Sequence, residues 1–198
     1  MPLATMQWTR VSVHAVVLAW LRAERGRLGE LLSATPEMLW LSGLRALLDQ
    51  AHLDNAEENR ARLRLLYMIR NLFMIEIPPD TEWYKVQNLT DNEVDELRAI
   101  NSSDWVSPAD KNELRRVAGR KTLTLDAAPS SWETPILWSH DRNGPFTILE
   151  GNNRLTAYTA SGQHGLLNIP VFVGLSPLAC IWHILDNCRP LMQDLFAR

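Results

Sequence analysis

The sequence is poor in the residues that mark several classes of protein. It has two cysteines, Cys180 and Cys188, so neither a disulfide framework nor a four-cysteine metal site is expected. Positive charge is not in surplus: a net charge of −3 and a pI near 6.0 argue against general binding to nucleic acid or acidic membranes. No apolar run is long enough to span a bilayer, and the run 11–21 lacks a small-residue cleavage site. These absences predict a cytoplasmic protein.

What is present is sufficient for a folded core. The chain has 198 residues, of which 46% are hydrophobic and 22% charged, as in ordinary globular proteins. Eight tryptophans stand against three tyrosines and four phenylalanines. Large indole rings favour either a well-filled core or a stacking surface, and the core is the more common use. There is no internal repeat and no low-complexity tract.

The N-terminal part of the chain has helical patterns throughout. Residues 8–32 form an amphipathic pattern, and Thr35 followed by proline is a strong signal for the start of a second helix. Asn55 is a candidate cap for a third helix over 56–75. Two prolines and an aspartate then end the block. The sequence therefore predicts a helical N-terminal extension or subdomain over residues 1–79.

The remaining residues, 80–198, mix strand and helix patterns. Apolar runs separated by an Asn-Gly turn predict an antiparallel hairpin. The predicted strands are 82–88, 134–139, 145–150 and 168–173. Further helices are expected after the capping box at Thr90, after Ser107 and over 177–196. The expected class is α+β, with a small mixed sheet packed with the helical N-terminal half, either as two domains or as one compact domain.

The segment Glu150-Gly-Asn-Asn-Arg154 carries the most specific chemical signal. Gly151 allows a sharp turn and a close approach to a ligand, and Asn152 and Asn153 tolerate left-handed backbone and offer hydrogen-bonding amides. Arg154, near the start of a helix, can grip a phosphate together with the positive end of the helix. Glu150 can orient Arg154, bind a metal or act as a base. The alternative is an ordinary strand-to-helix turn with a Glu–Arg pair.

This segment resembles the signature of the ParB/sulfiredoxin-like superfamily. The resemblance rests on the apolar strand before Glu150, the Glu-Gly-Asn-Asn-Arg turn and the following Ile-Pro-Val strand, within residues 146–173. In that family the turn leads into a His/Arg-Arg pair at a helix start and recognises phosphate. The resemblance implies a ParB/sulfiredoxin-like unit over about residues 82–175. It also implies that Gly151 and Arg154 contact phosphate and that Glu150 stands where free-serine kinases carry an acidic residue.

The resemblance further implies a function. It predicts binding of a nucleotide or another phosphate-bearing small molecule at the turn, with a kinase-like phosphotransferase as the enzymatic form. ATP or CTP with Mg²⁺ would be the cofactors, and Glu150 the Mg²⁺ ligand or base. Sulfinic-acid reductase activity is rejected, because Asn152 occupies the position of the nucleophilic cysteine. Asn153 replaces the customary His or Arg, which lowers the charge offered to a triphosphate.

Two alternatives remain open. His140 and Asp141, at the hairpin tip and expected close to the turn, are either an acid–base pair or ordinary turn residues. The whole protein is either a phosphate-binding protein or a non-enzymatic module for protein or nucleic-acid interaction, in which the turn is only architecture. No helix-turn-helix follows the motif, so specific nucleic-acid binding is disfavoured. The oligomeric state is left open.

Overall fold

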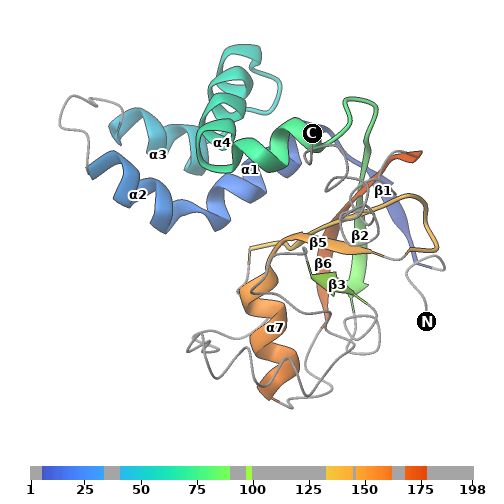
Figure 1. The fold of residues 1–198 in the computed structure, drawn as a ribbon. Coiled ribbons are helices and arrows are strands. Elements are labelled where there is room, and N and C mark those ends of the chain that lie inside the picture. The colour runs from blue at the N-terminus through green and yellow to red at the C-terminus, as the bar shows by residue number, and fades with distance from the viewer. Residues whose placement is uncertain are drawn as a thin grey trace, which may run out of the picture. The chain divides into compact units, whose positions relative to one another are not determined.

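The computed structural model describes residues 6–33, 41–89, 97–99, 133–144, 146–161 and 168–177 (Figure 1). The helix starts expected at Thr35, Thr90 and Ser107, and the helix expected over 177–196, lie outside these ranges except for residue 177. Both cysteines also lie outside them. The described residues contain every strand of the predicted hairpin and the whole turn from Glu150 to Arg154.

The chain divides into two compact units. One comprises residues 1–10 and 77–198 and contains a β-sheet, and the other comprises residues 11–76 and is helical. The helical unit ends at residue 76, and the sequence places the boundary near residue 79. The assignment of residues 1–10 to the helical part was wrong, because a short N-terminal strand pairs with the sheet of the other unit.

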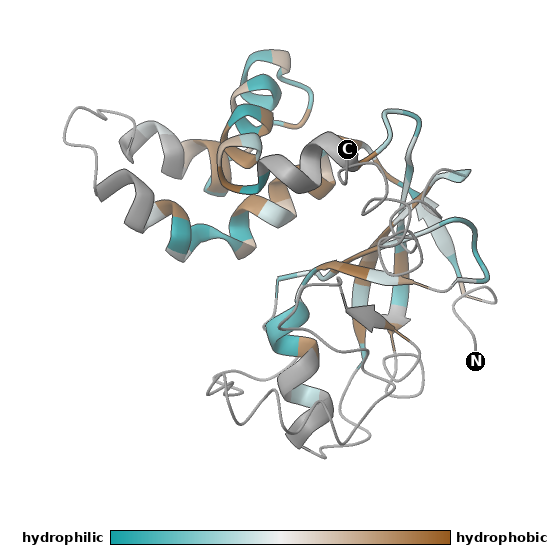
Figure 2. Ribbon diagram, in the orientation of Figure 1, coloured by the Kyte–Doolittle hydropathy of each residue, from teal (hydrophilic) through white to brown (hydrophobic). Residues whose placement is uncertain are grey.

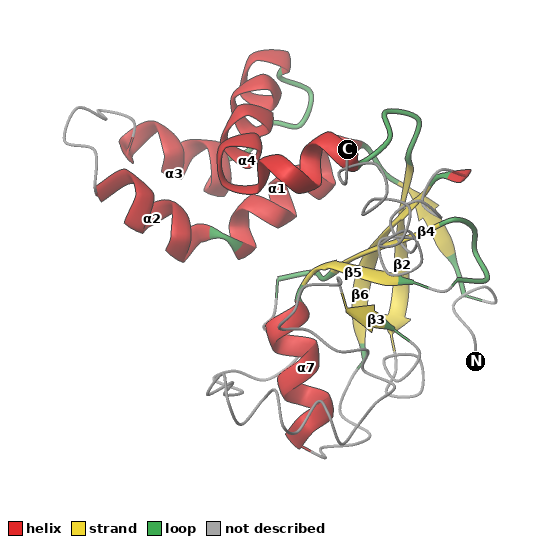
Figure 3. Cartoon of the chain, in the orientation of Figure 1, coloured by secondary structure: helices red, strands yellow, loops and turns green. Residues whose placement is uncertain are grey.

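The described part of the sheet unit contains six strands and one helix, and Figure 3 shows this helix, α7, beside the strands. The strands lie in the order β1-β2-β6-β4-β5-β3. Pairing is parallel between β4 and β6 and between β3 and β5, and antiparallel elsewhere, so the sheet is mixed and the α+β class is confirmed. The elements are β1 (Trp8–Arg10), β2 (Glu82–Leu89), β3 (Arg98–Ala99), β4 (Ile136–Ser139), β5 (Thr147–Glu150), α7 (Asn152–Ser161) and β6 (Ile169–Leu175).

The predicted hairpin and strands are confirmed. In the hairpin, Ile136 is the register partner of Glu150, and Trp138 that of Thr147. The strand predicted from Glu82 is β2, and it pairs with β6 over most of its length. Figure 2 shows that the central strands are largely hydrophobic, as expected for strands in the interior of a sheet.

One face of the sheet packs against α7. Leu155 and Tyr158 of α7 are buried in the same cluster as Val171, Val173 and Ile148 of the strands. Leu155 and Tyr158 lie three residues apart, which places them on one side of the helix. Burying a side chain of this size stabilises a fold by roughly 1.5–3 kcal/mol. Packing of its apolar side therefore fixes α7, and with it the turn from which the helix starts.

The helical unit consists of α1 (Val13–Ala23), α2 (Arg25–Ser33), α3 (Leu41–Asp49) and α4 (Ala56–Glu76). The single helix predicted over 8–32 was wrong at both its start and its middle. Ser12 caps α1 by accepting a hydrogen bond from the Ala15 N–H at 3.3 Å. Glu24 is a break between α1 and α2. In the described part of the chain, no helix combines the length and the apolar character needed to cross a membrane.

The helix predicted over 56–75 is confirmed as α4, and Asn55 caps it. The Asn55 Oδ1 accepts hydrogen bonds from the N–H groups of Glu57 and Glu58 at 3.0 and 3.2 Å. Non-helical backbone at Arg70 (φ −137°, ψ 34°) interrupts α4. The Arg70 guanidinium pairs with the buried Glu24 carboxylate, so an ion pair joins the break between α1 and α2 to the break in α4.

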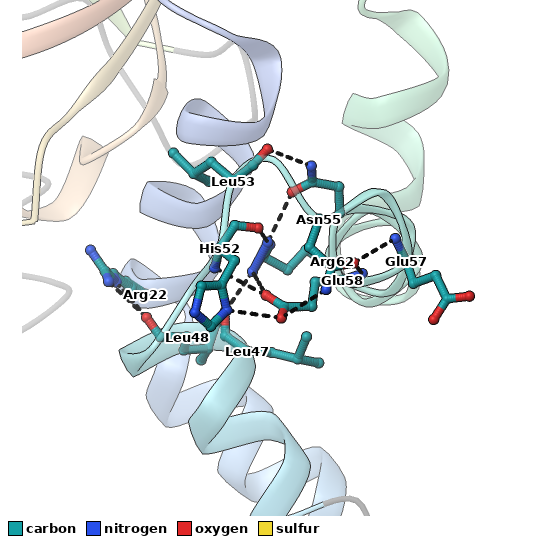
Figure 4. A network of polar contacts seen from close by, with 10 residues as sticks. Arg22, Leu47, Leu48, His52, Leu53, Asn55, Glu57, Glu58 and Arg62 are labelled. Carbon is teal, nitrogen blue, oxygen red and sulfur yellow. Dashed lines mark hydrogen bonds and ion pairs between the residues drawn. The ribbon is translucent and has the colours of Figure 1, made fainter.

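A buried arginine organises the connection between α3 and α4 (Figure 4). The Arg62 guanidinium donates to the carbonyl oxygens of Leu47 and His52, at 3.0 and 2.9 Å. It also donates to the Glu58 carboxylate at 3.2 Å and to the Asn59 Oδ1 at 2.9 Å. Arg62 is fully buried. These four acceptors compensate for the cost of removing a charge from water, which an unpaired guanidinium could not do.

Candidate functional site

The turn between β5 and α7 requires glycine at its second position. Gly151 is buried and has φ +99°, a backbone conformation that other residues adopt only with strain. A Cβ at this position would lie 3.1 Å from the Pro135 Cβ. The Leu155 N–H donates to the Gly151 carbonyl oxygen at 2.9 Å, which starts the hydrogen-bond ladder of α7. The predicted order of strand, glycine turn and helix is therefore confirmed.

Arg154 lies in the first turn of α7 and already has protein partners. Its Nη2 pairs with the Glu150 carboxylate, and its Nη1 donates to the Glu133 carbonyl oxygen at 3.1 Å. The side chains of Arg154 and Glu150 are 25% and 13% exposed. A guanidinium has five N–H groups, and these two bonds engage two of them. The guanidinium is therefore held in one orientation, and the side chain that carries it is partly exposed to solvent.

The two asparagines of the turn play different parts. The Asn152 Nδ2 donates to the Ile148 carbonyl oxygen at 3.1 Å, so this side chain folds back on β5. The Asn152 Oδ1 is buried, and it accepts no hydrogen bond from the described residues. Asn153 is exposed. Only Asn153 therefore presents its amide outward in the way that a ligand cradle requires, whereas Asn152 first serves to hold the turn.

Glu150 alone does not make a magnesium site. Mg²⁺ in proteins takes carboxylate oxygens, usually together with substrate phosphates and water. The Glu150 carboxylate is paired with Arg154, and within the described ranges no group of three or more His, Cys, Asp or Glu side chains is arranged to hold a metal ion. Glu150 would therefore act as a metal ligand or as a base with its carboxylate already paired to Arg154 through Oε2.

His140 and Asp141 do not belong to this site, contrary to the expectation that they lie close to the turn. Glu150 pairs with Ile136 at the start of β4, whereas His140 follows the end of β4. Four residues of extended strand separate the two positions by roughly 13 Å. The His140 Nδ1 and Asp141 Oδ2 lie 3.5 Å apart and both side chains are about half exposed. Asp141 also accepts from the Asn143 N–H at 2.7 Å, the geometry of an Asx turn.

Two residues of the site were missed from the sequence. The Glu133 carbonyl oxygen accepts a hydrogen bond from Arg154, 21 residues later in the chain, and Pro135 faces Gly151, 16 residues later. The predicted hairpin contained the signal for both. Its antiparallel register sets the start of β4 against the end of β5, and this brings residues 133–136 beside residues 150–151.

Comparison of the chain with protein-family models, with curated proteins and with solved structures found no match.

Proposed function

We propose that this protein binds a phosphate-bearing small molecule, such as a nucleotide, at the turn from Glu150 to Arg154. One observation carries the proposal: the Arg154 guanidinium is fixed at the start of α7 by two protein acceptors, and the side chain as a whole is 25% exposed. Fixing an arginine in advance lowers the entropy that binding costs. The N-terminal end of α7 adds a positive partial charge and backbone N–H donors for the same anion.

Glu150 sets the limits of this proposal. Its carboxylate neutralises most of the field of Arg154 at short range, so a ligand gains chiefly from directed hydrogen bonds and from the helix end. Weak to moderate affinity is therefore expected, and a single phosphate group suits the turn better than a triphosphate. Kinase-like transfer from ATP or CTP with Mg²⁺ is the enzymatic extension, in which Glu150 would be the Mg²⁺ ligand or the base.

A thermal-shift titration tests the binding. The ligands are inorganic phosphate, phosphorylated metabolites, and ATP and CTP with and without Mg²⁺. A ligand at a hundredfold excess over its Kd stabilises a fold by about 2.7 kcal/mol, which corresponds to several degrees in Tm. The shift is expected in the wild type and in Arg64→Ala, which alters an exposed arginine of the helical unit. It should be absent in Arg154→Ala.

Arg154→Ala also removes structural contacts, so a second variant separates binding from stability. Glu150→Gln keeps an oxygen acceptor beside Arg154 but removes the negative charge that opposes an anion. If the turn binds phosphate, Glu150→Gln binds it more tightly than the wild type. If no panel ligand shifts the Tm of either the wild type or Glu150→Gln at millimolar concentration, phosphate binding at this turn is wrong.

A non-enzymatic interaction module is the second candidate, and one observation favours it. Tyr67 and Met68, adjacent on α4, are 51% and 59% exposed, and exposed large apolar side chains that cluster are typical of interaction surfaces. Sedimentation velocity over a range of concentrations tests whether the partner is a second copy. Association that is present in the wild type and lost in a Tyr67→Ser, Met68→Ser variant would support this function. A monomer at all concentrations would exclude self-association through this surface.

A further inference from the structure

A second candidate site lies on β1, β2 and the β4–β5 hairpin tip. The Arg142 guanidinium lies 5.1 Å from the centre of the Trp8 ring and 5.2 Å from that of Tyr84. The two rings meet edge to face, with centroids 5.5 Å apart and planes at 73°. We call these two rings, with the adjacent Glu82 carboxylate, the cation notch. One positive group thus contacts two aromatic rings set at a wide angle.

The strand register explains why the rings meet. Trp8 is the partner of Val86, and Tyr84 precedes Val86 by two residues on β2. The two rings are therefore diagonal neighbours on one face of the sheet, within reach of each other. Arg142 comes from the hairpin tip, whose shape is set by the Asp141 turn and by Gly144 at φ +82°. Three segments distant in sequence thus converge.

The charges around the notch favour a cation. The Tyr84 hydroxyl donates to Glu82 at 2.7 Å, which ties the carboxylate to the edge of the notch. Glu82 also pairs with Arg10 at 2.9 Å; the Arg10 side chain is largely exposed and the Glu82 side chain about half exposed. Aromatic faces carry a negative quadrupole and attract ammonium and guanidinium groups within about 6 Å of the ring centre. Arg10 and Glu82 compensate each other's charge, so once Arg142 is displaced the attraction for a cation comes chiefly from the two ring faces.

We propose that the cation notch is a binding site for a guanidinium or quaternary ammonium group, and that Arg142 occupies it from the same chain. Arg142 is exposed at the hairpin tip, and its contacts with the rings are individually weak. An incoming cation can therefore displace it without disturbing the buried core. The site is independent of the phosphate proposal, since Glu150 lies at the other end of β5.

If Arg142 competes with an added cation, removing Arg142 should raise the affinity for that cation. When a binding-competent state is only partly populated, the apparent affinity falls by that fraction. Arg142→Ala removes the competing guanidinium from the two rings, so it should bind a cation on the order of fivefold more tightly than the wild type. If the contact of Arg142 with the rings is only structural, Arg142→Ala should bind the cation no more tightly than the wild type.

The experiment is a titration followed by the indole N–H signals in two-dimensional NMR. The probes are tetramethylammonium chloride and arginine amide, with potassium chloride at equal ionic strength as the control. Comparison with Trp8→Phe identifies the Trp8 signal, and Lys85→Ala, which alters a neighbouring cation of β2, serves as the matched control. We expect the Trp8 signal to move with either cation, and the curve for Arg142→Ala to saturate at lower concentration.

Which probe binds distinguishes an alkylated ammonium from a guanidinium as the preferred group. Equal affinity in Arg142→Ala and the wild type would overturn the proposal, as would a Trp8 response no larger than that given by potassium chloride. Should Trp8→Phe fail to fold, Tyr84→Leu provides the second test, since it removes one ring and must weaken binding in an Arg142→Ala background.

Discussion

Arg62 allows the sharpest test of how the helical unit is held together. The Arg62→Ala substitution removes a fully buried guanidinium and leaves two backbone carbonyls, Leu47 and His52, and the Asn59 Oδ1 without this donor. Leaving one buried polar group unsatisfied costs about 1–3 kcal/mol, and breaking a buried charged network by removing one partner costs about 3–5 kcal/mol. Water can reach the Glu58 carboxylate, which is 23% exposed. The lower end, about 3 kcal/mol, is therefore expected.

The measurement is thermal and chemical unfolding of matched arginine variants. A loss of about 3 kcal/mol lowers the Tm of a protein of this size by roughly 6–12 °C. Arg64→Ala, two residues along the same helix and exposed, should change stability by less than about 0.5 kcal/mol. Arg62→Lys retains the charge but not the forked donor geometry, so it should fall between the two. If Arg62→Ala and Arg64→Ala unfold within a degree of each other, the network does not stabilise the α3–α4 connection as argued.

Three further predictions concern single side chains. The hydrogen bond from the backbone N–H of His52 is the main reason that the pKa of Glu58 lies below its ordinary value of 4.5. Burial of the carboxyl opposes this shift, whereas the His52 side chain and the charge of Arg62 add to it. The stability that Glu58 contributes is therefore complete above about pH 4.5 and lost as the pH falls below it. In Glu58→Gln, the urea concentration at the unfolding midpoint should change less with pH between about pH 3 and 6 than it does in the wild type. Gly151→Ala should destabilise the fold by about 1–2 kcal/mol, because it places a Cβ at positive φ against Pro135, and calorimetry should show no such loss for an exposed glycine. Gly174→Ala sets a Cβ 2.8 Å from an indole carbon of β2, and a drop in Tm corresponding to about 1–3 kcal/mol should accompany it, whereas an unchanged Tm would mean that the indole moves freely.

Local signals predicted the elements well where the chain itself contains the cause. Asn55 before α4 offers a side-chain oxygen to the first N–H groups of the helix, and the structure uses it in this way. The hairpin follows from two apolar runs around an Asn-Gly turn. The failure at residues 8–32 has a physical reason. Trp8–Arg10 is a strand only because β2 pairs with it, and the start of the α1 helix was signalled by the Ser12 cap, which was overlooked.

The site was predictable in part for the same reason. Glycine at a sharp turn and the Glu150–Arg154 pair follow from five consecutive residues, so the sequence alone indicated them. The Glu133 carbonyl and Pro135 could be placed only by knowing the hairpin register. The cation notch was beyond reach, because it needs β1, β2 and the hairpin tip together, and β1 was taken for the start of a helix.

The route of the chain through its two units makes one strand dependent on the fold of the other unit. The chain leaves the sheet after Arg10, forms the helical unit over residues 11–76, and returns to pair β2 with β1, where Arg10 is the partner of Tyr84. If the helical unit unfolds, β1 is tethered by a flexible loop, and closing a loop of that length costs roughly 2 kcal/mol more than closing one of about five residues. A strand of three residues has few hydrogen bonds with which to offset that cost. Melting of the helical unit should therefore release β1, and with it Trp8. Unfolding of the helical unit would then remove the edge strand from the sheet of the other unit.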